Sequence, residues 1–267
     1  MIFSYFFGVS FSISVYIVLV WYFLRGKYGQ QSLNIGLISA FSSAFGAKWS
    51  ARFLEGFSPL ENITEYFSFW RGGDVFVGGL ILGVTSTLIW SVYKRKSPLD
   101  VFDDLTKPAA LGYAFYRIAV CFLTGCCYGK PYVGKLSASF KPLSPAYNRY
   151  GNYPLYPTQL YEAGIGIIIF VLLMLTENRI KNKKGYKTAL FISSYAFLRT
   201  IVEFLRGDIS ERFYIFTVNF KGIWGIDVWQ VAIITVGCLY LFFLWTISKK
   251  QGNLQERNNE PNQILGR

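Results

Sequence analysis

Residues 193–208 read SSYAFLRTIVEFLRGD and continue an apolar run that is long enough to form a membrane helix. Four polar side chains in this stretch share one stripe of a helix: Tyr195, Arg199, Glu203 and Arg206. A charge at the centre of a bilayer costs roughly 2.5–3.5 kcal/mol, so these groups are expected to face a protein interior or a wet cavity. Two interpretations stay open. The stripe is either an ion pair that registers neighbouring helices or a cationic pocket for an anionic headgroup, in which Glu203 orients Arg199.

The composition indicates one membrane domain. Of the 267 residues, 52% are hydrophobic and 19% aromatic, a balance that soluble domains of this size rarely have. The net charge of +12 is typical of basic cytoplasmic loops in such a protein, so we expect no nucleic-acid partner. The chain has no histidine, which removes the commonest acid–base residue and metal ligand. We expect a transmembrane domain over residues 1–250 and a polar cytoplasmic tail over 251–267.

The hydropathy pattern predicts an all-α, multi-pass membrane protein with about seven transmembrane helices and a small extracytoplasmic cap. The loops that follow the first, third, fifth and seventh apolar runs carry Lys and Arg at about three times the density of the other loops. The N-terminus is therefore predicted outside and the C-terminus in the cytoplasm, with the Pro- and Tyr-rich segment 128–157 as an ordered external cap. The first run is expected to be retained as a span. The predicted spans are 3–24, 32–55, 74–93, 106–127, 158–176, 188–206 and 223–247.

Other spans also contain polar or small residues. Lys48 and Arg52 are one helical turn apart, and they either snorkel to the interface or lie near anionic lipid. Gly78 and Gly79 open the third span, where they allow either close helix packing or the approach of a lipid phosphate. Arg117 lies deep in the fourth span and needs an anionic or polar partner.

The fourth and fifth spans end or begin with further candidates. Cys121, Cys126 and Cys127 are a poor ligand set without histidine, because adjacent cysteines rarely chelate together, and we favour a packing role for them. Gln159 and Glu162 lie on one face at the start of the fifth span.

Taken together, these motifs resemble those of one family, the prolipoprotein diacylglyceryl transferases. The most specific part of the resemblance is YPTQLYEA followed by a YxxxRxxxEFxRxD pattern. The matching segments run in the same order along nearly the whole chain: WRGGDVFVGGLILG (70–83), RIAVCFLTGCCYGKP (117–131), YPTQLYEA (156–163), SYAFLRTIVEFLRGD (194–208) and WQ (229–230).

The resemblance implies an enzyme of the bacterial plasma membrane. It would move diacylglyceryl from phosphatidylglycerol to the lipobox cysteine thiol in the signal peptide of a prolipoprotein, releasing glycerol phosphate without a metal or other cofactor. Membrane lipids are its other expected partners. The expected catalytic residues are Arg199, Glu203, Tyr195 and Arg117. The expected substrate-binding residues are Gly78, Gly79, Gly129, Gln159, Tyr5 and Arg206.

Three positions depart from the family pattern. Val77 stands where the family has a histidine, and Cys121 replaces an asparagine-type residue. The family arginine of the fourth span would fall on Ile118, whereas the arginine present is Arg117. One residue turns a helical side chain by about 100°, and a local bulge in the helix could restore the register.

The matches to the family pattern and the departures from it leave two possible functions. One is lipoprotein diacylglyceryl transfer, which the Arg199–Glu203 stripe favours. The alternative, which Val77 favours, is a divergent member that acts as another phospholipid-headgroup transferase or as a lipid-binding membrane protein.

If the chain is active, the proton of the substrate cysteine thiol must be removed without a histidine as the base, because the chain has none. Glu203 is a weak base if it pairs with Arg199, because an adjacent cation lowers the pKa of a carboxyl group. Tyr5, Tyr195 and water are the other candidates. We expect a cationic field to lower the pKa of the incoming cysteine thiol, while Arg199 stabilises the leaving phosphate. Arg117, Arg199 and Glu203 are predicted to face one cavity that opens to the outer leaflet, with the two glycines on its wall.

Overall fold

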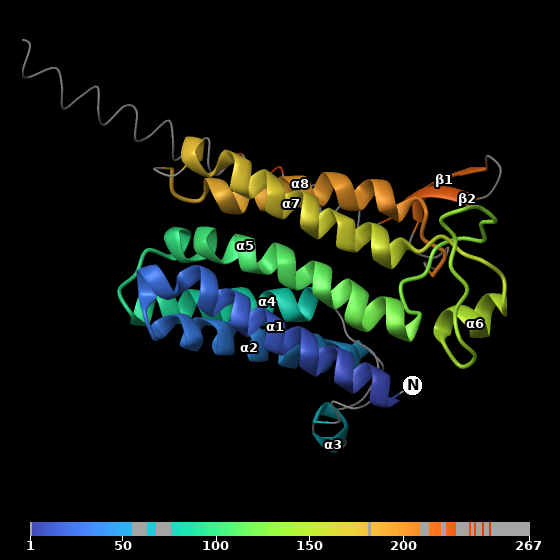
Figure 1. The fold of residues 1–267 in the computed structure, drawn as a ribbon, viewed down its shortest axis with the longest axis horizontal. Coiled ribbons are helices and arrows are strands. Elements are labelled where there is room, and N and C mark those ends of the chain that lie inside the picture. The colour runs from blue at the N-terminus through green and yellow to red at the C-terminus, as the bar shows by residue number, and fades with distance from the viewer. Residues whose placement is uncertain are drawn as a thin grey trace, which may run out of the picture.

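The computed structural model describes residues 2–54, 63–67, 76–180, 183–208, 214–219 and 223–227, together with positions 235, 238, 242 and 246. The long helices run roughly along one direction (Figure 1). The elements are α1 (Ile2–Tyr28), α2 (Gln31–Leu54), α3 (Ile63–Tyr66), α4 (Phe76–Tyr93), α5 (Pro98–Tyr116) with the π-helix η1 (Arg117–Phe122), α6 (Pro145–Tyr150), α7 (Thr158–Ile180), α8 (Tyr186–Glu203), β1 (Tyr214–Asn219) and β2 (Ile223–Asp227).

Six predicted spans coincide with helices, but the predicted number of seven spans is not confirmed. Among the described residues, Ser4–Tyr28 and Thr158–Ile180 are the helices long and apolar enough to cross a membrane, and Gly78–Tyr93 is a shorter apolar helix. Many large apolar side chains remain exposed on the helix surfaces, as Val18 (60%) and Leu175 (73%) illustrate, and a lipid environment accounts for such exposure.

Residues 214–219 and 223–227 differ from the prediction. The segment 207–222 was expected to be a loop and residue 223 to start the last span, but β1 and β2 form an antiparallel hairpin there. Tyr214 pairs with Asp227, and a bulge lies between Tyr214 and Phe216. The fold is therefore helical with one small sheet. Most of the predicted last span and the tail 251–267 lie outside the described residues.

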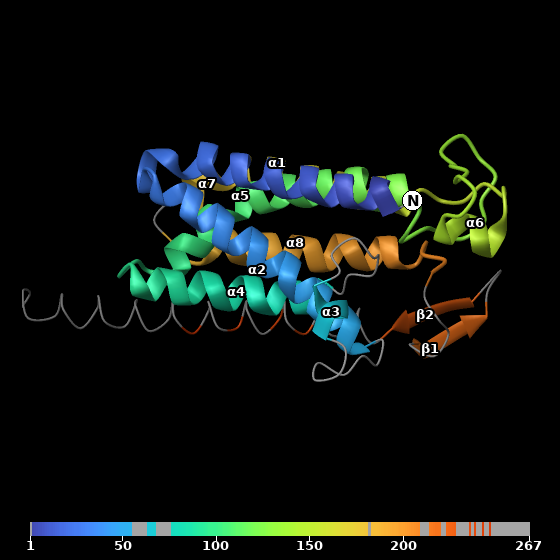
Figure 2. The same ribbon diagram turned by 90° about the horizontal axis from the view of Figure 1, so that it is seen from below.

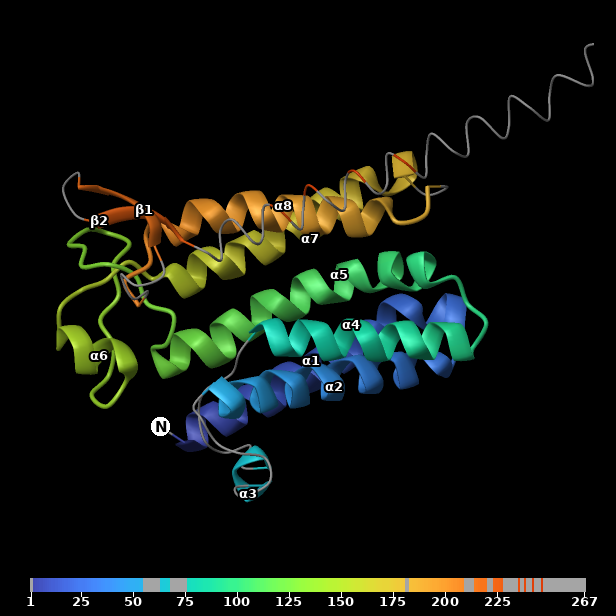
Figure 3. The ribbon, with the colours of Figure 1, turned by 180° about the vertical axis from the view of Figure 1, so that it is seen from behind.

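The helices form two groups that meet at α5. In the first group α2 contacts both α1 and α4, and in the second α7 and α8 contact each other (Figures 1 and 3). Helix α5 contacts α1 on one side and α7 and α8 on the other. Each group has its own apolar core: Val20, Leu24, Ile35 and Trp90 belong to the first, and Ile165, Ile169, Leu173 and Val202 to the second.

Helix α8 begins where a carboxylate from α5 caps it. Asp103 accepts hydrogen bonds from the backbone N–H of Gly185 (2.7 Å) and Thr188 (2.8 Å) and from the Thr188 hydroxyl (2.7 Å). These bonds satisfy donors that a helix N-terminus leaves unpaired. They also fix α8 against α5, which sets the rotation at which its polar stripe faces the interior.

The segment 128–157, which is predicted to be the external cap, lies at the same end of the molecule as the β1–β2 hairpin (Figure 2). Ser144 caps α6 by accepting a hydrogen bond from the Tyr147 N–H (3.1 Å). A small apolar core holds the segment together, and it consists of Tyr128, Phe140, Ala146 and Leu155.

Candidate functional site

A single buried carboxylate, Glu162 on α7, gathers cations from two other elements. Its side chain is fully buried, and its Oε2 lies 2.5 Å from Nε of Arg117 and accepts a hydrogen bond from the Tyr113 hydroxyl at 3.0 Å. Its Oε1 lies 3.4 Å from Nε of Arg199 and 3.8 Å from Nη1 of Arg206. Buried ionised groups require such pairing, so Glu162 organises the cluster.

Arg117 stands at the junction where α5 passes into a π-helix, and its own backbone N–H still bonds to the Tyr113 carbonyl as in a regular α-helix. η1 starts at Arg117 and continues α5 as a π-helix, in which one extra residue per turn is accommodated. Arg117 is only 8% exposed, whereas Ile118, the position that counting along a regular helix selects, is 43% exposed. A local bulge is therefore present, but it shifts the register of the residues that follow Arg117, whereas Arg117 itself faces the interior from the regular end of α5.

The stripe on α8 supplies the rest of the cluster. The Arg199 guanidinium pairs through Nη1 with Glu203 one turn later. Arg206, just beyond the end of the helix, binds Asp208 through Nε (2.8 Å) and Nη2 (2.5 Å) and lies 4.0 Å from Glu203. The predicted stripe is therefore an interhelical ion-pair network that also includes Glu162.

Gly129 fixes the position of Arg206 through the backbone. The two residues form a β-bridge, with Lys130 N–H donating to the Leu205 carbonyl (2.8 Å) and Gly207 N–H to the Tyr128 carbonyl (2.9 Å). A Cβ at position 129 would lie 2.5 Å from atoms of Tyr156. Only glycine permits this close approach.

Aromatic rings border the arginines. The ring of Tyr113 lies 5.0 Å from the Arg117 guanidinium carbon and packs edge-on against Tyr195, with the ring centroids 5.5 Å apart. Tyr195 therefore borders the cluster from α8, one turn before Arg199. These contacts stabilise the buried guanidinium beyond its ion pair.

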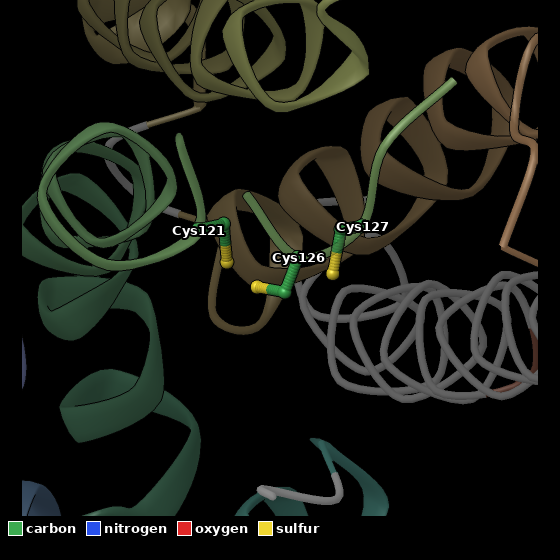
Figure 4. A group of neighbouring side chains, drawn as sticks. All are labelled: Cys121, Cys126 and Cys127. Atoms are coloured by element: carbon green, nitrogen blue, oxygen red, sulfur yellow. The ribbon is translucent and has the colours of Figure 1, made fainter. Parts of the chain in front are cut away.

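Three cysteine thiols lie next to Arg117. The sulfurs of Cys121, Cys126 and Cys127 are all within 4.8 Å of one another (Figure 4). Arg117 Nη1 is 3.6 Å from the Cys121 sulfur and 3.4 Å from the Cys127 sulfur. Gln159 belongs to the same region, because its Nε2 donates to the Cys126 carbonyl (2.6 Å).

The other predicted site residues lie in the first helix group. Tyr5 contacts Lys48, whose Nζ is 3.5 Å from the Tyr5 hydroxyl. A Cβ on Gly78 would overlap Ser50 and the Gly46 carbonyl of α2, which confirms the packing interpretation of the glycine pair. The other interpretation, phosphate binding by Gly78 and Gly79, stays a prediction. Lys48 and Arg52 are buried, so the snorkelling interpretation is wrong.

Three members of the cluster were not predicted as site residues: Glu162, Tyr113 and Asp208. The sequence did contain a signal for these partners: each arginine in an apolar run needs a buried anionic or polar group beside it, and so the acidic residues of neighbouring spans are candidates. In the completed cluster three cations face three carboxylates, so the six groups carry no net charge when ionised: Arg117, Arg199 and Arg206 against Glu162, Glu203 and Asp208.

Apolar helices that pack around a buried arginine–carboxylate network indicate a helical membrane protein. The chain belongs to the prolipoprotein diacylglyceryl transferase family, whose model matches residues 2–246.

Curated relatives support the same assignment. A protein of Clostridium tetani is 30% identical over 186 residues, which are 69% of this chain and 72% of that protein. A protein of Azospirillum brasilense is 34% identical over 151 residues, covering 55% of this chain and 54% of that protein. One of Rhodospirillum rubrum is 33% identical over 150 residues, covering 55% and 52%. All three are named phosphatidylglycerol–prolipoprotein diacylglyceryl transferase.

Proposed function

We propose that the chain transfers diacylglyceryl from phosphatidylglycerol to the lipobox cysteine thiol of prolipoproteins, in the bacterial plasma membrane. The observation that carries the proposal is the convergence of Arg117, Arg199 and Arg206 on buried Glu162 in a member of this family. Buried guanidinium groups are suited to a phosphodiester and to the charge that develops on its leaving oxygen.

The arginines have different tasks in this proposal. The contacts of Arg199 with Glu162 and Glu203 use Nε and Nη1, and a guanidinium carries N–H donors on all three of its nitrogens. The two carboxylates orient the guanidinium, and Arg199 stabilises the leaving phosphate. Arg117, on η1, and Arg206, which is bridged to Gly129 of the cap, bind the phosphodiester.

The arrangement in the membrane is part of the proposal. Seven spans place the N-terminus outside, the cap 128–157 outside and the loop 177–187 in the cytoplasm, as the density of Lys and Arg favours. Single substitutions at two exposed positions, Lys141→Cys and Lys183→Cys, in a background lacking the natural cysteines, test the orientation in intact cells. A membrane-impermeant thiol reagent is expected to label position 141. Labelling of position 183 alone would reverse the topology.

Rescue of a transferase-depleted bacterial strain tests the function, with lipidation of a lipoprotein as the readout. The wild-type chain is expected to restore lipidation. Arg199→Lys is expected to lower it severely, because an ammonium group cannot reproduce the planar two-point grip on a phosphate. The matched control is Arg179→Lys, at an exposed position near the end of α7, which is expected to act as wild type. Full activity of Arg199→Ala would remove the site assignment.

Two further measurements address the missing histidine. Val77→His is expected to be tolerated or to raise lipidation in the same strain, because it restores the imidazole of the family pattern. The rate of the purified enzyme, measured with chemistry rate-limiting, is expected to rise with pH until the substrate thiol is ionised. A flat profile between about pH 6 and 9 would contradict thiolate formation as the difficult step.

A further inference from the structure

The three thiols beside Arg117 form a compact group that the arginine network does not explain. Cys121 comes from η1, and Cys126 and Cys127 come from the turn that follows it. Their sulfurs are within 4.8 Å of one another, and Figure 4 shows all three side chains meeting on one side of the turn. Packing alone requires no such convergence of three polarizable atoms.

An unusual backbone produces this convergence. Gly125 (φ 69°) and Cys127 (φ 55°) both adopt the left-handed conformation, on either side of Cys126. A non-glycine residue rarely adopts it, and such strain persists where the surroundings impose it. Gln159 holds the Cys126 carbonyl at 2.6 Å and Thr158 holds the Cys127 carbonyl at 2.6 Å. Adjacent cysteines thereby present their sulfurs to one point.

We propose that Cys121, Cys126 and Cys127 bind a zinc ion whose fourth position takes the thiol of the incoming lipoprotein cysteine. Three protein ligands with an open fourth position are the pattern of catalytic zinc sites, and thiolates are soft ligands that suit zinc. Sulfurs in a tetrahedral site with bonds of about 2.3 Å are about 3.8 Å apart. Closing the present group to that spacing needs movements of no more than about 1 Å.

The surroundings fit an anionic metal–thiolate centre. Three thiolates and Zn²⁺ carry one net negative charge, and the Arg117 guanidinium lies 3.4 Å and 3.6 Å from two of the sulfurs. Such hydrogen bonds to metal ligands tune the centre from outside the coordination shell. A bound zinc ion would also ionise the incoming thiol, a task for which the chain has no histidine.

The chemistry balances without an oxidant. The substrate cysteine binds as a thiolate, and its proton leaves to solvent. The sulfur then attacks the glyceryl carbon that carries the phosphate. A C–S bond forms, the C–O bond breaks, and the electron pair stays on the oxygen of the departing glycerol phosphate, beside the arginines. Zinc remains Zn²⁺, and the neutral thioether is a weak ligand that leaves. This step rests on the proposed function.

Metal binding is tested on the purified full-length protein. After loading with zinc and gel filtration, we expect about one zinc per chain by elemental analysis. Cobalt loading is expected to give sulfur-to-cobalt charge-transfer absorption, which reports thiolate ligation without any activity assay. Cys127→Ser and Cys121→Ser are expected to lose both signals. The matched control is Cys238→Ser, because Cys238 is exposed and outside the group, and it is expected to keep both.

Two results would overturn the metal site. One is wild-type protein without stoichiometric zinc or thiolate–cobalt absorption, and the other is zinc bound equally by wild type and Cys127→Ser. Intact-mass analysis that finds a disulfide among the three cysteines in the isolated protein would also overturn it in favour of a redox pair. The cobalt spectrum of the wild type keeps the test decisive even where a variant fails to fold.

Lipidation separates this inference from the proposed function. Bound zinc in a chain that does not rescue the depleted strain leaves the metal site standing and removes the transferase assignment. Rescue by the wild type that is unchanged in Cys127→Ser removes the zinc-bound thiol alone. Loss of rescue in Cys127→Ser together with loss of zinc supports both.

Discussion

Replacing Glu162 with glutamine removes the negative charge on which the arginine network depends. Glu162 is fully buried and lies 2.5 Å and 3.4 Å from the Nε atoms of Arg117 and Arg199. The glutamine keeps the side-chain volume and a carbonyl oxygen for the Tyr113 hydroxyl. The substitution therefore isolates the loss of charge. It leaves two buried guanidinium groups without their shared partner.

The expected loss in the free energy of unfolding follows from this unpaired positive charge. Breaking a buried ion pair by removing one partner costs about 3–5 kcal/mol, because the remaining charge is buried and uncompensated. For a chain of this size, 1 kcal/mol shifts Tm by about 2–4 °C, so we expect a decrease in Tm of roughly 6–20 °C. The double substitution Glu162→Gln with Arg117→Gln is expected to cost less than the sum of the two single changes, by about 1–3 kcal/mol.

Thermal unfolding of the detergent-solubilised protein measures the effect. Glu177→Gln on the same helix is the matched control: its side chain is 35% exposed and pairs with Lys107 and Lys187, so its expected cost is about 0.2–1 kcal/mol. If Glu162→Gln lowers Tm no more than Glu177→Gln does, Glu162 does not hold the cluster together.

Two further predictions concern helix packing and capping. Gly166→Ala is expected to destabilise the protein by about 1–3 kcal/mol, because the new Cβ would lie 2.6 Å from the Ala110 carbonyl oxygen of α5. Gly164→Ala, with open space around it, is expected to be neutral or stabilising by a few tenths of a kcal/mol, and equal melting temperatures would refute the close contact. Asp103→Ala removes the cap of α8 and is expected to cost about 2 kcal/mol in the same assay. Asp100→Ala, which breaks a partly exposed pair with Lys184, is the comparison and is expected to cost less than about 1 kcal/mol.

The α8 stripe could be predicted from sequence because helical periodicity and the cost of a charge in an apolar run both constrain it. Arg199, Glu203 and Arg206 accordingly lie together. Glu162 was not included because an acidic residue in the first turns of a helix is also the ordinary complement of the helix dipole. Its role depends on contacts with α5 and α8, which no local pattern encodes.

The register of Arg117 shows a different limit. A π-helical turn changes the direction of every following side chain, but its sequence RIAVCF reads as ordinary apolar helix. The prediction of a bulge needed the mismatch with the family pattern. The β1–β2 hairpin was not predicted because its sequence pattern is ambiguous. Its β-branched and aromatic residues favour strands, but the same residues also suit the start of a membrane span.

The joint between the cap and α8 has a mechanical consequence. Backbone hydrogen bonds tie Lys130 to Leu205, Gly207 to Tyr128, and Gly129 to the Tyr156 carbonyl. Three chain segments are thus linked at one point, and Arg206 is part of that joint. A substrate that displaced the cap would strain this joint and pull Arg206 away from Glu162, whereas Arg117 on η1 lies outside it. A substrate that leaves the joint intact keeps all three arginines on Glu162.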